Sequence, residues 1–297
     1  MNLLDKFEAV EITVDTRISE DDRNFCAAHE AAYEMAKNSL QEFLFFWEDM
    51  LESQKNLPTV PDSKQTDYLP SKNVLDISPS AIKHHIETLH VCFIENLIRY
   101  FNHRYHVSAS IYAIMNKLLP QEPDRHSASA EEISLYKSAF QTLSLTANQV
   151  VEEIFSQFDG RGLDEQAFYE LKQNCHKVSW NIYQKKPLYE RKKSVIRFLC
   201  TGCSYKDWRH DSCWELSDAM KNILLGISHY ETRSLSVIPP EIGSLLKQVY
   251  IGSDLTEFTD CKKVKQFRLF KNGRADIRFA DESLARCFEE EYLGTVC

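Results

Sequence analysis

The residues near the C-terminus constrain the fold most, because FRLFKNGRADIRF alternates apolar and charged side chains on both sides of Asn272-Gly273. Asn-Gly is a strong signal for the turn of a β-hairpin. A two-residue loop would mix apolar and charged side chains on both faces of the hairpin. A three-residue loop, with its glycine in the left-handed conformation, pairs Phe267 with Ile277 and separates the two kinds of side chain. A one-residue slip turns every side chain to the other face, so the sequence predicts the three-residue loop.

In this register the hairpin has one apolar face and one charged face. The apolar face carries Phe267, Leu269, Ala275, Ile277 and Phe279. The charged face carries Gln266, Arg268, Arg274, Asp276 and Arg278. Asp281 is placed to cap a following helix, which has Leu284, Phe288 and Tyr292 on one side and ends at Gly294. We expect the hairpin and this helix to cover the body of the protein and to leave the arginines in solvent.

The rest of the chain is mostly helical by pattern, with only 8 glycines and 9 prolines in 297 residues. Helices are expected at about 24–54, 80–106, 108–120, 147–158, 164–176, 214–227 and 240–249, and a further helix is expected to begin at Ser129. Ser78-Pro79 begins the second of them, and Ser129 with Glu132 forms a capping box. Strands are expected around Val10–Val14 and in VIRFL. The sequence therefore predicts a mainly helical α+β protein with a small antiparallel sheet, which the N-terminal strand can join.

The segment 57–78 is the best candidate for a linker, because it carries three prolines and no periodicity. On this basis 1–56 forms an N-terminal strand and long helix, and 79–297 forms a helical body that ends in the hairpin and its helix. The long helix has a stripe at approximate helical spacing, consisting of Ala28, Ala32, Met35, Leu40, Phe43 and Trp47.

The net charge of −9 is unevenly distributed. Residues 1–80 hold 16 acidic and 7 basic side chains, and residues 81–297 hold 28 of each. This balance opposes general nucleic-acid binding, but it permits a local basic patch. The opening MNLLDKFEAVEITVD lacks a basic stretch before an apolar core, and FLFFW and VCFIENLI fall short of the roughly 20 residues that span a bilayer. We expect a cytoplasmic protein with reduced thiols and no membrane partner.

Two basic segments are candidates for contact with nucleic acid. Between Lys262 and Arg278 there are seven cations against Asp276 alone, and 185–197 holds six cations and one acid around Tyr189. Basic side chains beside an aromatic ring are typical of surfaces that follow a phosphate backbone. The expected contacts are Lys192, Lys193, Arg268, Lys271, Arg274 and Arg278. The alternative is that these cations form a solvated loop and the charged face of an edge strand, which discourages pairing with other chains.

The C-terminal stretch FRLFKNGRADIRF, followed by a helix that ends in EEYLG, resembles the end of the bacterial family called domain of unknown function 4942. The matching residues are Phe270, Lys271, Asn272, Gly273, Phe279, Tyr292 and Gly294. The histidine that the family usually has in the second strand is absent here, and the match covers about thirty residues. The resemblance implies a gene of mobile elements, sometimes grouped with methyltransferases. The nearest glycine-rich loop, FDGRGLDE, lies between two helical patterns, so methyl transfer is not expected.

Arg99 and His106 are spaced R-x6-H, which resembles the loose R-x4–6-H pattern of HEPN ribonucleases. In those enzymes the arginine and histidine, paired across a dimer, position and protonate the RNA backbone. Histidine suits acid–base work because its pKa lies near neutrality. Asn102 and His103 are the neighbours of this pair on the expected helix.

Cys200, Cys203, His210 and Cys213 follow the spacing C-x2-C-x6-H-x2-C. Two thiolates at the first spacing, with a later histidine and cysteine, can complete a tetrahedral zinc site. The alternative is that Cys200 is a small core residue after a strand. Glu87-x-x-His90 is half of a carboxylate-bridged di-metal motif, and no second copy is present.

No nucleophile elbow, phosphate-binding loop or H-E-x-x-H motif occurs in the sequence. The leading hypothesis is therefore a non-catalytic accessory protein that binds nucleic acid or a protein partner through its basic C-terminal region. The alternatives are a HEPN-like ribonuclease, with Arg99 and His106 as catalytic residues, and a zinc-stabilised scaffold.

Overall fold

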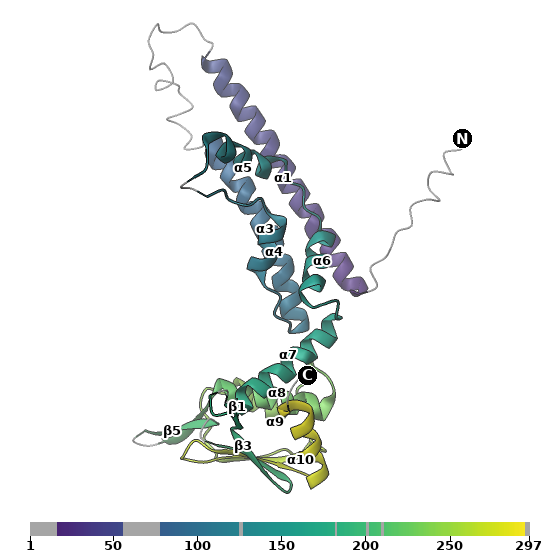
Figure 1. The fold of residues 1–297 in the computed structure, drawn as a ribbon, viewed down its shortest axis with the longest axis vertical. Coiled ribbons are helices and arrows are strands. Elements are labelled where there is room, and N and C mark those ends of the chain that lie inside the picture. The colour runs from purple at the N-terminus through teal and green to yellow at the C-terminus, as the bar shows by residue number, and fades with distance from the viewer. Residues whose placement is uncertain are drawn as a thin grey trace, which may run out of the picture. The chain divides into compact units, whose positions relative to one another are not determined.

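The computed structural model describes residues 17–55, 78–124, 127–181, 183–199, 202–208 and 211–294 (Figure 1). They form two compact units, which divide at Leu163. The described residues are mostly helical, with small antiparallel sheets that include C-terminal strands followed by a helix, so the predicted fold class is confirmed. The division falls inside 79–297, which the sequence pattern had grouped as one body. The predicted strand around Val10–Val14 and the predicted linker, up to residue 77, lie outside the described residues.

The first unit is built from helices (Figure 1). Its described helices are α1 (Glu20–Lys55), α3 (Pro79–Tyr105), α4 (Ile111–Leu118), α5 (Ala130–Thr142) and α6 (Ala147–Gln157). The predicted caps are present: the Ser78 side chain accepts a hydrogen bond from the backbone of Ala81, and Ser129 forms a capping box with Glu132. Helices α1 and α3 lie alongside each other and bury the apolar face of α3, which includes Ile86, Phe93 and Leu97.

The buried face of α1 differs from the predicted stripe. Ala28, Ala32, Met35 and Phe43 of that stripe are exposed, whereas its Trp47 is buried, together with Tyr33 and Leu44 from outside the stripe. The core side of the helix is set by residues at intervals of three, four and seven, at 22, 26, 33, 37, 44 and 47. Two of them, Asp22 and Lys37, are charged, and this polar content hides the pattern in the sequence.

Polar side chains connect α1 to α3 inside the first unit. His90 is fully buried; its Nε2 donates to the carbonyl oxygen of Phe140 at 2.9 Å, and its Nδ1 accepts from the Tyr33 hydroxyl at 2.8 Å. Asp22, also fully buried, accepts hydrogen bonds from Ser19 and Tyr100. His90 is therefore a satisfied core residue, and its ring nitrogens are occupied by protein partners.

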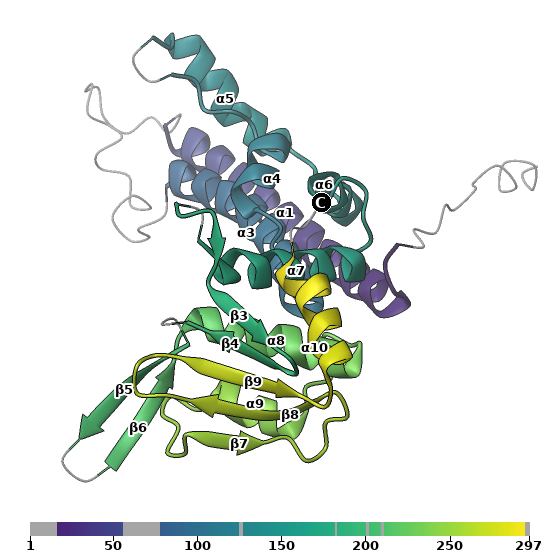
Figure 2. The ribbon, with the colours of Figure 1, turned by 60° about the horizontal axis from the view of Figure 1, so that its bottom comes forward.

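The second unit contains a five-stranded antiparallel sheet in the order β3-β4-β9-β8-β7 (Figure 2). Its strands are β3 (Tyr189–Lys192), β4 (Val195–Phe198), β7 (Leu255–Glu257), β8 (Val264–Leu269) and β9 (Ala275–Phe279). Two small pairs accompany it: β1 (Trp180–Asn181) with β2 (Lys186–Pro187), and β5 (Cys203–Trp208) with β6 (Asp211–Leu216). The helices are α7 (Leu163–Ser179), α8 (Asp218–Thr232), α9 (Pro240–Lys247), α10 (Glu282–Phe288) and the π-helical turn η3 (Glu289–Leu293).

The predicted hairpin register is confirmed in β8 and β9. Phe267 pairs with Ile277, and Arg268 pairs with Asp276. Gly273 has a φ of 81°, as the three-residue loop requires. All five residues of the predicted apolar face are buried at 2% exposure or less and pack in one core with α8, α9 and α10. The Asp281 side chain accepts from the backbone of Leu284, so the predicted cap is present.

The tertiary structure corrects two local expectations. The hairpin lies in the middle of the sheet, between β4 and β7, and not at its edge. Trp214–Leu216, expected to begin a helix, forms the end of strand β6, and the helix begins only after its cap, Ser217. The pattern WELSDAM has helical spacing, but pairing with β5 overrides that local preference. None of the described helices is both long enough and apolar enough to cross a bilayer.

Candidate functional site

The face of the five-stranded sheet that points away from α8, α9 and α10 carries Arg268 and Arg278 of the predicted hairpin, in two rows that cross all five strands. The cross-strand pairs place Lys192, Val195, Arg278, Gln266 and Glu257 in the first row. The second row consists of Glu190, Arg197, Asp276, Arg268 and Leu255. We call these ten residues the outer face. It contains four cations and three acids, so its charge is nearly balanced.

The acids neutralise part of the basic surface that the hairpin alone predicts. Asp276 lies between two arginines, with its Oδ1 3.3 Å from Nε of Arg197 and 3.1 Å from Nε of Arg274. Arg268 forms an ion pair with Asp254 at 3.5 Å. Of these acids only Asp276 belongs to the hairpin. The expectation of seven cations against one acid therefore does not describe the folded surface.

One end of the outer face stays basic, because the fold brings the two basic segments together. Lys192 and Arg278 flank Val195 in the first row, and Lys193 follows in the exposed turn between β3 and β4. The Lys192 side chain is 65% exposed and has Glu190 3.7 Å away. We call Lys192, Lys193 and Arg278 the basic corner. It joins residues that lie more than eighty positions apart in the sequence.

The hairpin turn, by contrast, packs against the protein. The backbone N–H of Gly202 donates to the carbonyl oxygen of Gly273 at 2.8 Å. A Cβ at Gly202 would lie 2.6 Å from Cβ of Ala275, so only glycine permits this approach. Lys271 lies over the ring of Tyr205 with its Nζ 4.4 Å from the centroid, and the Arg274 guanidinium lies 3.5 Å from the centroid of Phe270. Two of the predicted phosphate contacts are therefore committed to aromatic rings.

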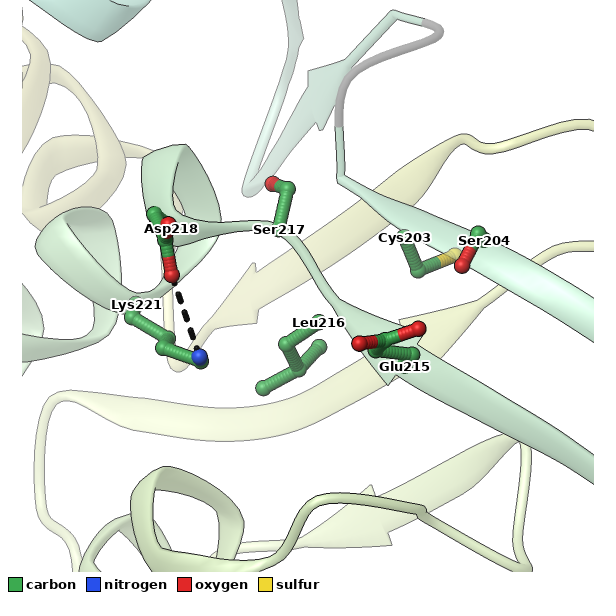
Figure 3. A pocket seen from close by; sticks show the side chains of 7 residues that line it. All are labelled: Cys203, Ser204, Glu215, Leu216, Ser217, Asp218 and Lys221. Carbon is green, nitrogen blue, oxygen red and sulfur yellow. Dashed lines mark hydrogen bonds and ion pairs between the residues drawn. The ribbon is translucent and has the colours of Figure 1, made fainter.

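A depression of about 350 Å³ opens where β5 and β6 meet the start of α8 (Figure 3). Burial raises the pKa of Cys203, so its thiol stays protonated, and it contacts the carbonyl oxygen of Phe270 at 3.6 Å. Ser217 accepts from the backbone of Met220 as a helix cap, and Lys221 pairs with Asp218 at 3.1 Å. Glu215 in turn pairs with Lys206 at 2.5 Å, and none of the described contacts here forms a nucleophile–base pair.

The structure places Cys203 and Cys213 on opposite faces of the β5–β6 pair. Cys203 lies opposite Leu216, whereas Cys213 lies opposite Lys206, an odd number of residues away from Cys203. Side chains alternate along a strand, so these two thiols point away from each other. Cys200 and His210 lie outside the described residues. Among the described residues no group of three His, Cys, Asp or Glu side chains is placed to hold a metal.

In the first unit, the structure brings Arg99 and His106 to one open groove along α3. The groove is lined by Asn96, Arg99, Tyr100, His103, Arg104 and His106. The Arg99 side chain is 66% exposed and lies 3.2 Å from a Glu95 oxygen. His106 caps the helix in the left-handed conformation, with a φ of 58°. Asn102 is not part of the groove, since its amide bonds both the N–H and the carbonyl of Ala109.

No protein-family model, no curated protein and no solved structure matches this chain. The resemblance of the C-terminal hairpin to the domain of unknown function 4942 therefore stays a prediction. Sequence inspection had not placed Glu190 and Glu257 on the same face as the hairpin arginines, because these acids belong to strands outside the hairpin. It had also missed Asp22, which looks like an ordinary acidic residue in the first turn of a helix.

Proposed function

We propose that the second unit is a non-catalytic interaction module that holds the phosphate backbone of a nucleic acid at the basic corner of its sheet. The observation that carries this proposal is the first row of the outer face, in which Lys192 and Arg278 flank Val195. Lys193 extends the same cluster from the adjoining turn. Cations grouped in this way supply the charge that phosphate contacts need.

The proposal divides the predicted contact residues into two groups. Lys193 and Arg278 are exposed and lie in no ion pair among the described residues, and Lys192, 65% exposed, has Glu190 3.7 Å away, a longer contact than those of Arg268 and Arg274. Arg268 and Arg274 lie in ion pairs with Asp254 and Asp276, so a phosphate would have to compete with a carboxylate that is already present. Because exchanging one anion for another releases few counterions, these two arginines should contribute little to the salt dependence of binding.

The experiment measures the binding of the full chain to labelled single-stranded DNA, single-stranded RNA and duplex DNA by fluorescence anisotropy, at several salt concentrations. Two double variants are compared. One combines Lys192→Gln with Arg278→Gln, and the other combines Arg268→Gln with Arg274→Gln, so each removes two positive charges. The first pair should lower the slope of log affinity against log salt by about 1 to 2, and the second by well under 1. If the two pairs behave alike, or the native chain binds none of the probes, the proposal fails.

A second function, RNA cleavage by the first unit, is supported by one observation. Arg99 and His106 both reach solvent in one groove, together with His103 and Arg104. An arginine stabilises charge on a phosphate, and a histidine transfers protons during cleavage. Incubation of the full chain with a labelled RNA should then give products that disappear in Arg99→Ala and in His106→Ala. His84→Ala is the matched control, since His84 is 74% exposed at the other end of α3. Cleavage that persists in Arg99→Ala and His106→Ala would come from another source.

A further inference from the structure

Helix α1 presents a large apolar surface to solvent on the side opposite its buried residues. Met35 is 71% exposed, Phe45 is 75% exposed and Phe46 is 62% exposed. Ala28, Ala31 and Ala32 continue the same side toward the start of the helix. We call these six residues the α1 face. Exposed apolar surface of this extent commonly marks a contact with another molecule.

The spacing of the α1 face suits a second helix lying along it. Ala28, Ala31, Met35 and Phe46 follow intervals of three, four and eleven residues, which keep them on one side of the helix. Phe45 lies about 100° around the helix from Phe46 and widens this side. From Ala28 to Phe46 the surface extends about 27 Å, at 1.5 Å per residue. The alanines allow close approach of a partner backbone, and the two phenylalanines provide large anchors at the other end.

The exposed charges that α1 itself carries have one sign, and two of its acids have a cation of α3 beside them, Lys83 at Glu48 and Arg104 at Asp21. Every exposed charged side chain that the structure describes on α1 is acidic, namely Glu20, Asp21, Glu42, Glu48, Asp49 and Glu52. The cations of the helix whose side chains are described are not exposed, since Arg23 is half-buried and Lys37 is buried. Complementary charge favours an encounter with a basic surface and opposes one with an acidic surface.

The same charges argue against a second copy of this chain as the occupant. An antiparallel pair of α1 helices centred on Met35 sets Asp49 of one copy against Asp21 of the other. A parallel pair sets Glu42 against Glu42. The parallel arrangement therefore brings like charges together, which opposes association. In the antiparallel arrangement Arg104, 3.5 Å from Asp21 of its own copy, offsets only part of the contact between Asp49 and Asp21, so a basic partner complements the acids of α1 better than a second copy does.

We propose that the α1 face binds a basic amphipathic helix of a partner protein. The apolar side of the partner covers Met35, Phe45 and Phe46, and its lysines or arginines lie beside Glu42 and Asp49. This inference concerns the first unit and does not rest on the function proposed for the second.

The test uses the full chain and two labelled peptides of about 18 residues, long enough to cover the face. One peptide consists of leucine and lysine at helical spacing, and the other replaces each lysine by glutamate. Binding is measured by fluorescence anisotropy at physiological salt. The leucine–lysine peptide should bind the native chain, and the leucine–glutamate peptide should bind at least about tenfold more weakly.

Two variants examine the two parts of the proposal. Phe45→Gln with Phe46→Gln removes the anchors, and Glu42→Lys with Asp49→Lys reverses the charge. Each double variant should weaken binding of the leucine–lysine peptide about tenfold or more. Leu135→Gln is the control, because Leu135 is 63% exposed on α5 of the same unit, and it should leave binding unchanged. The substituted positions are exposed, so the helical circular dichroism signal should persist.

Three results would overturn the proposal. The first is equal binding of the two peptides, and the second is binding that neither double variant weakens. The third is a native chain that sediments as a dimer and becomes a monomer in Phe45→Gln with Phe46→Gln, because the occupant would then be a second copy.

Discussion

Replacing Asp22 by asparagine tests whether a buried carboxylate holds the first unit together. Asp22 is fully buried, and its two oxygens accept from the backbone and hydroxyl of Ser19 at 3.1 and 2.5 Å and from the Tyr100 hydroxyl at 2.8 Å. Tyr105 also donates to it, and Nε of Arg104 lies 2.9 Å away. These contacts join the start of α1 to the end of α3.

Asparagine fills the same volume but replaces one acceptor oxygen by a donor. On the Oδ1 side the amide deprives Tyr100 and Arg104 of their acceptor, and on the Oδ2 side it deprives Ser19 and Tyr105. A hydrogen bond to a charged group contributes about 1.5 to 3 kcal/mol. With at least two such bonds lost, and part of the loss recovered by water at Arg104, we expect destabilisation of about 3 kcal/mol. For a unit of this size that lowers the melting temperature by roughly 6–12 °C.

The effect should depend on pH with a defined sign. Burial alone would raise the pKa of Asp22, but hydrogen bonds from Ser19, Tyr105 and Tyr100 outweigh it, so the pKa lies below its ordinary value. A carboxyl group whose pKa is lowered by folding contributes stability above its unfolded pKa and loses it as the pH falls through the folded pKa. The difference between native chain and variant should stay constant from about pH 5 to 8 and shrink below about pH 4.

Urea unfolding of the full chain, followed by circular dichroism, measures the loss, and hydrogen exchange of peptides from α3 assigns it to the first unit. Asp21→Asn is the matched control. Asp21 is the neighbouring residue and pairs with the same Arg104 at 3.5 Å, but its side chain is 81% exposed, so the cost should be under about 0.5 kcal/mol. A loss for Asp22→Asn below about 1 kcal/mol, or equal losses for the two variants, would refute the reasoning.

Three further predictions concern single residues. Gly202→Ala should destabilise the second unit by about 1–3 kcal/mol in urea unfolding, because the new Cβ would lie 2.6 Å from Cβ of Ala275. Gly252→Ala, where a Cβ would have no atom within 4 Å, should be neutral, and equal effects of the two variants would contradict the packing argument. His90→Gln should destabilise the first unit at pH 7.5 and less so toward pH 5. Burial lowers the pKa of His90, so the native chain loses stability as the pH falls below about 6.5. A difference in stability between the native chain and His90→Gln that grows toward pH 5 would contradict this reasoning. Gly273→Ala should cost about 1 kcal/mol because Gly273 has a positive φ of 81°, and an unchanged urea midpoint would show that the turn relaxes.

The sequence determined those features in which a local pattern has only one good solution. The register of the C-terminal hairpin followed from the alternation around Asn272-Gly273, because the alternative register exposes half of the apolar side chains. The caps at Ser78, Ser129 and Asp281 followed from short-range hydrogen bonding, which does not depend on distant residues.

Only the tertiary structure decided what surrounds these local features. The buried side of α1 contains Asp22 and Lys37, which become tolerable only when Tyr100, Arg104 and Glu34 supply partners. The charged face of the hairpin is basic when the hairpin is considered alone. In the sheet, Glu190 of the edge strand β3 and Glu257 of the edge strand β7 lie on the same face. Charge on a surface is a sum over every strand that contributes to it, whereas hairpin register depends on two neighbouring strands. For that reason the sequence determined the shape of this hairpin, and the assembled sheet determined its charge.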